Sequence, residues 1–249
     1  MHYVGKFEDS ALAPHSRYAG RSDGYAEAAL VNDRTGSVHT GLDVSALAVN
    51  GHVSPHVHSF EEGWLQMAAP QPKPIGRERD TFFPTPTSTP IPAPTPTLTP
   101  ADAAAHGDLL GHFDSSQIPR TDEGRQTSGG LQGVFLKWMI DEKLGARHHR
   151  MLFIEYQPGV SIGLHDHTFE ESYFILSGEV EATLDGRTYL AKAGSVLWTG
   201  VGCVHAFANV GREPVRWLET FSPQPPAENV FRFVAEWEQR AKELEGQPS

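Results

Sequence analysis

The sequence predicts an all-β fold of the sandwich or barrel type. From residue 131 onward, short apolar runs such as GVFLKWMI and SYFILSG follow one another, and glycine, proline, asparagine or aspartate bounds many of them. Short strands separated by such residues are typical of antiparallel sandwiches and barrels. Two histidines also stand two residues apart in one run, which places both on the same face of a strand. We therefore expect residues 131–225 to form one β-barrel.

A proline-rich segment divides the chain. Residues 84–100 read PTPTSTPIPAPTPTLTP. Proline at nearly every second position removes backbone donors and fixes φ, so this segment predicts an extended linker. We assign the linker and a polar connection to residues 84–130. A smaller N-terminal β region over residues 1–83 is expected before it, because residues 37–58 alternate and contain β-branched residues.

The end of the chain predicts a helix and tail over residues 226–249. Apolar residues recur there at steps of four and three, namely at Val230, Val234, Trp237, Ala241 and Leu244. A single apolar stripe of this kind is typical of an amphipathic α-helix. We expect the helix to pack on the outside of the barrel or across a dimer contact.

Composition narrows the class of protein. The chain has 249 residues, of which 39% are hydrophobic, and its formal net charge is −11. An acidic chain repels phosphate backbones, so nucleic acid is not an expected partner. No stretch approaches the roughly 18–20 apolar residues that cross a bilayer, and the start lacks the features of a signal peptide. We expect a cytoplasmic protein with no membrane partner.

The single cysteine, Cys203, excludes an intramolecular disulfide. It is interpreted either as a small core residue or as a nucleophile in a pocket.

The two halves of the chain contain a repeat. HVHSFEE (56–62) matches HDHTFEE (165–171) at an offset of 109 residues, and residues 37–49 align with 146–158 in pattern at the same offset. Further on, WLQMAAPQP (64–72) matches WLETFSPQP (217–225) at an offset of 153 residues. The difference of 44 residues indicates that the first copy lacks several strands that the second copy has.

The second copy contains the candidate metal ligands. His165 and His167 share a strand face, Glu171 follows four residues later, and His205 lies in another strand-like run. Glu170 is the alternative to Glu171. Two or three imidazoles with one carboxylate suit Mn, Fe, Co, Ni, Cu or Zn and leave positions open for water or substrate.

Two segments of the second copy resemble the two motifs of the cupin superfamily. The first motif is matched by Gly159, His165, His167, Glu171 and Gly178, and the second by Gly194, Gly202, His205 and Asn209. Gly200 stands where the family usually has proline. The resemblance implies a double-stranded β-helix, or jelly roll, with one metal ion bound by His165, His167, Glu171 and His205. The family spacing to Gly178 favours Glu171 over Glu170.

The first copy is therefore interpreted as a truncated cupin remnant, which makes the ancestral form a bicupin. It keeps His56, His58 and Glu62 but has no counterpart of His205. We expect one functional metal site and not two.

Aromatic side chains are expected to fill the barrel and wall its pocket, namely Tyr173, Phe174, Trp198 and Phe207.

The segments LGARHHRMLFIEYQPG and YFILSG are similar to (S)-ureidoglycine aminohydrolases among the bicupins. That resemblance implies a Mn-dependent hydrolase or aminohydrolase that acts on a small polar molecule. With Fe(II), the open metal positions would instead allow dioxygenase chemistry. A non-catalytic cupin that binds a small ligand, or an inactive one, is the third alternative. A homodimer is expected, in which residues 37–67 add strands to a barrel.

Metal analysis tests the assignment of ligands to one copy. We expect about one metal ion per purified chain, lost in His167→Ala and kept in His58→Ala. Retention of metal by His167→Ala would overturn the assignment.

Overall fold

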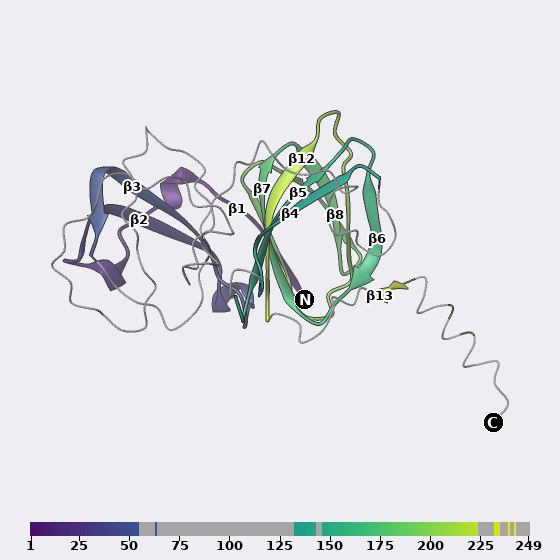
Figure 1. The fold of residues 1–249 in the computed structure, drawn as a ribbon, viewed down its shortest axis with the longest axis horizontal. Helices are drawn as coiled ribbons and strands as arrows, with labels where there is room; N and C mark the ends of the chain where they lie inside the picture. The colour runs from purple at the N-terminus through teal and green to yellow at the C-terminus, as the bar shows by residue number, and fades with distance from the viewer. Residues whose placement is uncertain are drawn as a thin grey trace, which may run out of the picture.

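The computed structural model describes residues 1–54, 63, 132–142, 146–223, 232–234, 239 and 242. Within these residues, strands form two facing antiparallel sheets and a separate hairpin (Figure 1). The six-stranded sheet has the order β1 (His2–Lys6), β10 (Ser195–Thr199), β7 (Glu170–Ser177), β12 (Val215–Ser222), β5 (Arg150–Tyr156) and β4 (Val134–Ile140). The five-stranded sheet has the order β13 (Arg232–Phe233), β6 (Ser161–Asp166), β11 (His205–Ala208), β8 (Glu179–Leu184) and β9 (Arg187–Lys192). The all-β, jelly-roll prediction is confirmed.

The barrel interior is apolar because alternate residues of each strand point inward. On β12, Val215, Trp217 and Phe221 belong to the interior cluster, whereas Leu218 belongs to an outer one. Aromatic rings supply much of the interior packing. The Phe207 and Trp217 rings, for example, stack with their centroids 5.7 Å apart.

The N-terminal strand is part of this barrel. Strand β1 pairs with β10, with His2 opposite Thr199 and Lys6 opposite Ser195. The Gly200 N–H donates a hydrogen bond of 2.9 Å to the Met1 carbonyl. A proline at position 200 has no N–H to donate, so the departure from the family motif matches the docking of β1.

The hairpin repeats the pairing of two barrel strands. Strands β2 (Ser22–Val31) and β3 (Leu42–Val53) pair with Val31 opposite Leu42. Strands β4 and β5 pair with Ile140 opposite Met151, at the same offset of 109 residues. Both pairs also shift register just before these positions. The upstream part of the repeat is therefore a structural repeat, while residues 56–62 and 64–72 lie outside the described residues.

The hairpin packs on the outer face of the six-stranded sheet. Ala28, Leu30 and Val31 of β2 form one buried cluster with barrel side chains. The barrel side chains of this cluster are Met151, Phe174, Val196, Trp198 and Leu218. The prediction that Phe174 and Trp198 fill the barrel is wrong. Their side chains point out of the barrel and are buried against the hairpin, whereas those of Tyr173 and Phe207 do lie inside the barrel.

The segment predicted to form the C-terminal helix contains a short strand. Arg232 and Phe233 form β13, which pairs with β6 at Asp166 and His165. Sheet pairing prevails over the apolar helical spacing at these two residues. Val234, Gln239 and Lys242 are helical, and the other residues of 224–249 lie outside the described ones. Among the described residues, the structure contains no helix with the length and apolar character that a membrane span requires.

Glu170 fastens the loop between β2 and β3 to the barrel. Its carboxylate accepts hydrogen bonds from the Ser37 hydroxyl at 2.7 Å and from the N–H groups of Val38, His39 and Thr40 at 2.9 to 3.2 Å. Burial alone would raise the pKa of Glu170, but the His39 N–H, the Ser37 hydroxyl and the other N–H groups lower it below its usual value.

Glu170→Gln should lower the free energy of unfolding at neutral pH by about 2 kcal/mol, since a charged acceptor of several buried donors is lost. Because the pKa of Glu170 is lowered in the folded state, its contribution is present above the unfolded pKa and is lost as pH falls through the folded one. Denaturant unfolding at several pH values measures this. Glu181→Gln, at an exposed position of β8, is the matched control and should change little. An equal loss of stability in both variants would contradict the role of Glu170.

Candidate metal centre

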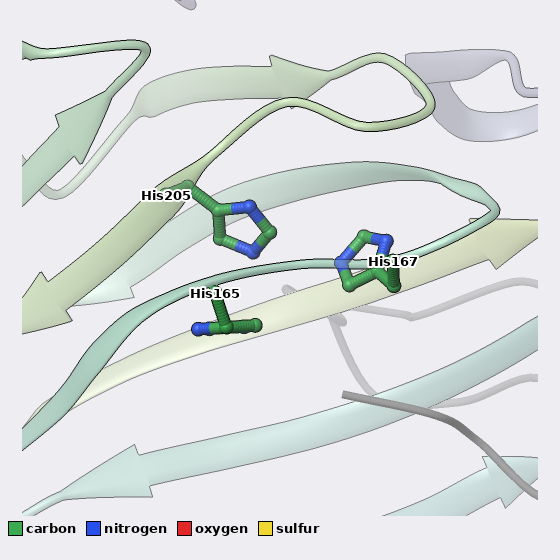
Figure 2. A group of neighbouring side chains, drawn as sticks. All are labelled: His165, His167 and His205. Atoms are coloured by element: carbon green, nitrogen blue, oxygen red, sulfur yellow. The ribbon is translucent and has the colours of Figure 1, made fainter. Parts of the chain in front are cut away.

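The strands bring the predicted ligands to one place in the barrel. His165 lies on β6 and His205 on β11, and these two residues are direct partners in the antiparallel register. His167 follows β6, and Glu171 is the second residue of β7. Figure 2 shows the three imidazole rings facing one shared space. All four side chains are buried, with exposed fractions between 1% and 4%.

The backbone fixes which nitrogen of each histidine faces that space. The Nδ1 atoms lie 2.8 Å from the Gly163 carbonyl for His165, 3.0 Å from the Phe169 carbonyl for His167, and 2.9 Å from the Cys203 carbonyl for His205. A carbonyl only accepts, so each Nδ1 carries a hydrogen and donates it. Nε2 is therefore the atom with which each neutral ring can bind a metal ion, which is the arrangement that outer carbonyl partners give to metal-binding histidines.

Glu171 faces this histidine cluster and Glu170 does not. The Glu171 Oε2 atom lies 2.7 Å from the His167 Nε2 and 3.5 Å from the His205 Nε2. The Tyr173 hydroxyl also donates to Oε2. On β7, Glu171, Tyr173 and Ile175 point inward, so Glu170 must point outward, where it binds the loop of the hairpin.

The buried charges of this site shift one another's pKa values. Burial lowers the pKa of His167, but attraction to Glu171 and their hydrogen bond outweigh it, and the pKa is raised. Burial likewise raises the pKa of Glu171, and the charge and hydrogen bond of His167 bring it well below its usual value. Burial, followed by repulsion from His205, lowers the pKa of His165 to about 4. Near neutral pH, the His165 imidazole is thus neutral.

A second carboxyl group, Glu219, was missed in the sequence. It lies on β12 opposite Tyr173, at an inward position between Trp217 and Phe221. It accepts a hydrogen bond of 3.0 Å from the Trp217 Nε1 and hydrogen-bonds Glu171. Burial and the charge of Glu171 raise its pKa well above the usual value. The alternation of VRWLETF offered the signal, because it places one acid on the apolar face of a strand.

The residues present fit a divalent transition ion. The Nε2 or Nδ1 atoms of His165, His167 and His205 all lie within 4.8 Å of one another. Imidazole nitrogens suit Mn, Fe, Co, Ni, Cu and Zn, and a carboxylate on the same ion would supply negative charge. The three histidines could therefore hold one ion. His56, His58 and Glu62 of the first copy lie outside the described residues.

The antiparallel barrel and its converging histidines define a cupin-type protein. A family model described as the cupin domain matches residues 152–221. The polyketide synthase CurC of Streptomyces cyaneus is 34% identical over 110 residues, which are 44% of this chain and 69% of that protein. The chain belongs to the cupin superfamily.

Two further relatives match the chain over a smaller part of their own length. The HTH-type transcriptional regulator PuuR of Escherichia coli is 32% identical over 95 residues, 38% of this chain and 51% of that protein. An oxalate-binding protein of Thermotoga maritima is 40% identical over 62 residues, 24% of this chain and 51% of that protein. The chain thus spans about half the length of these two relatives.

Solved structures resemble the barrel in part. The polyketide cyclase RemF of Streptomyces resistomycificus is 21% identical with a TM-score of 0.42, over 53% of this chain and 93% of that one. A protein of Thermotoga maritima described as a predicted oxalate decarboxylase is 27% identical with a TM-score of 0.39, over 45% of this chain and 97% of that one.

The two adjacent glutamates give a matched pair of variants. Glu171→Gln should weaken metal affinity by about 100-fold, because a neutral amide replaces a charged ligand. Glu170→Gln changes the same group one residue away but outside the barrel, so its metal affinity should stay within about threefold of wild type. Competition with a fluorescent chelator measures both constants. Equal affinities in the two variants would remove Glu171 from the ligand set.

Proposed function

We propose that this protein is a divalent-metal-dependent enzyme that acts on a small polar substrate by hydrolysis or amine release. In this proposal His165, His167, Glu171 and His205 hold the ion. The observation that carries it is the orientation of the three histidines, whose Nδ1–H groups are all bound to backbone carbonyls. Such an ion would polarise a substrate oxygen or activate a bound water.

Two further polar groups support an enzyme over a structural metal site. The Tyr173 hydroxyl lies beside Glu171 and 3.4 Å from the His205 Nε2, and Glu219 approaches the same carboxylate from β12. A structural ion does not need additional hydroxyl and carboxyl groups next to its ligands. Here these groups can hydrogen-bond a polar substrate and fix its orientation.

The relatives support a small ligand that carries oxygen atoms. One is named for binding oxalate, and another is named as a polyketide synthase. Both descriptions concern molecules rich in carbonyl or carboxylate oxygens, which are hard donors that bind Mn or Fe.

The test is turnover by protein that has been stripped of metal and reloaded with Mn²⁺, Fe²⁺ or Zn²⁺. Ureido, amino and keto acids are offered in turn, and released ammonia, product mass and dissolved oxygen are followed together. We expect ammonia or a hydrolysis product without oxygen uptake, at a rate reduced about 100-fold or more in Glu219→Gln. His167→Ala is the control that should lack metal-dependent turnover.

Two outcomes would contradict the proposal. Oxygen consumption that is stoichiometric with product in the Fe²⁺ form would show a dioxygenase instead. Saturable binding of a compound in calorimetry, with no turnover for any ion, would show a ligand-binding cupin.

A further inference from the structure

A second group of metal-ligating side chains lies outside the histidine cluster. His2 of β1, Asp185 between β8 and β9, and Cys203 between β10 and β11 place a ring nitrogen, a carboxylate oxygen and the thiol sulfur within 4.8 Å of one another. These residues stand at positions 2, 185 and 203, so one strand and two connections of the fold converge there. The group uses none of the four residues assigned to the barrel ion.

The positions of the three side chains are fixed by neighbouring bonds. The Asp185 N–H donates to the Val204 carbonyl at 2.8 Å, and the Val204 N–H donates to the Asp185 Oδ1 at 3.2 Å. The His2 Nδ1 lies 3.1 Å from the Asp185 Oδ2, and its Nε2 lies 2.9 Å from the Tyr189 hydroxyl. A carboxylate only accepts, so the His2 Nδ1 carries the hydrogen beside Asp185. An ion bound at Nδ1 would leave the hydrogen on Nε2, where the Tyr189 hydroxyl can accept it, as in a metal-binding histidine with an outer partner.

The separation of His2 and Asp185 is that of two ligands on one ion. Two ligands bound at about 2.0 to 2.1 Å in a tetrahedron lie roughly 3.3 Å apart, and the His2–Asp185 contact is 3.1 Å. Cys203 is buried at 1% exposure, while the Asp185 side chain is 34% exposed. An ion could therefore enter from the Asp185 side and meet the sulfur behind it.

The chemistry selects the class of ion. An imidazole, a carboxylate and a thiolate together carry two negative charges, which one divalent cation neutralises. Sulfur excludes the hard ions Mg²⁺ and Ca²⁺, whereas a mixed nitrogen, oxygen and sulfur set suits Zn²⁺ or Co²⁺. The thiol also hydrogen-bonds Asp185, so the sulfur and the carboxylate already contact each other.

We propose that His2, Asp185 and Cys203 form a second metal site, for Zn²⁺ or a similar borderline divalent ion, at the surface of the barrel. The site adjoins the barrel centre through the loop that holds Cys203, because the Cys203 carbonyl accepts the Nδ1–H of His205. An ion bound to the Cys203 sulfur would thus fix the residue that orients a ligand of the barrel ion.

The second site should be the weaker of the two. The Met1 ammonium lies 2.8 Å from the Asp185 Oδ2, so an ion must displace a cation from one of its ligands. It offers three side-chain ligands where the barrel centre offers four. The purified protein is therefore expected to keep the barrel ion and to fill the second site only when metal is added.

Cobalt titration under reducing conditions distinguishes the two sites. Because Cys203 is the only cysteine of the chain and the barrel centre has no sulfur, a thiolate-to-cobalt charge-transfer band reports the second site alone. We expect this band to grow with the second equivalent of Co²⁺ in the full-length protein. His2→Gln should weaken the affinity read from the band by about tenfold or more, and Cys203→Ala should abolish the band. His167→Ala, which removes a barrel ligand, should keep it.

The proposal is overturned by the absence of the band at saturating Co²⁺ in wild type. It is also overturned if His2→Gln and Asp185→Asn leave the affinity read from the band unchanged, because the sulfur would then bind cobalt without the other two residues.

Discussion

The alternation of strand β7 is the constraint on which both faces of the barrel depend. Glu171 and Tyr173 point into the barrel, and Glu170 and Phe174 point outward. Inside, the strand gives a carboxylate to the histidines. Outside, it gives a carboxylate to four donors of the hairpin loop and an aromatic ring to the outer cluster. A shift of one residue in register would exchange these roles, burying Phe174 at the metal centre and exposing Glu171.

The hairpin shows how the N-terminal region is used. Strands β2 and β3 repeat the register of β4 and β5. Apolar side chains of this hairpin pack against the outer face of the six-stranded sheet. Strand β1, from the same end of the chain, extends the six-stranded sheet beside β10. The N-terminal region therefore contributes to the stability of the barrel whatever its own metal-binding capacity is. Its connection to the metal centre passes through Glu170 and through the loop that holds Gly200 and Cys203.

The barrel and the clustering of its histidines could be predicted from the sequence, because both depend on local spacing. Spacings of two on a strand, and turn glycines such as Gly178, are local features with fixed geometric meaning. The pairing of strands that lie far apart in the sequence could not be predicted in this way. The pairing of β1 with β10 joins segments nearly two hundred residues apart, and nothing local in HYVGK indicates its partner. The outward direction of Phe174 and Trp198 could not be predicted without knowing that a hairpin covers them. Glu219 was not predicted, because a lone acid on an apolar strand face becomes part of the site only through the pairing of β12 with β7.

The central claim is that three imidazoles, oriented by backbone carbonyls, hold one ion together with Glu171. A crystal grown with one equivalent of Mn²⁺ or Zn²⁺ per chain, with diffraction measured at the absorption edge of that metal, tests it most directly. We expect one anomalous peak bonded to the Nε2 atoms of His165, His167 and His205 and to a carboxylate oxygen of Glu171. An ion bound elsewhere, or a histidine of this set whose Nε2 faces away from the ion, would contradict the account.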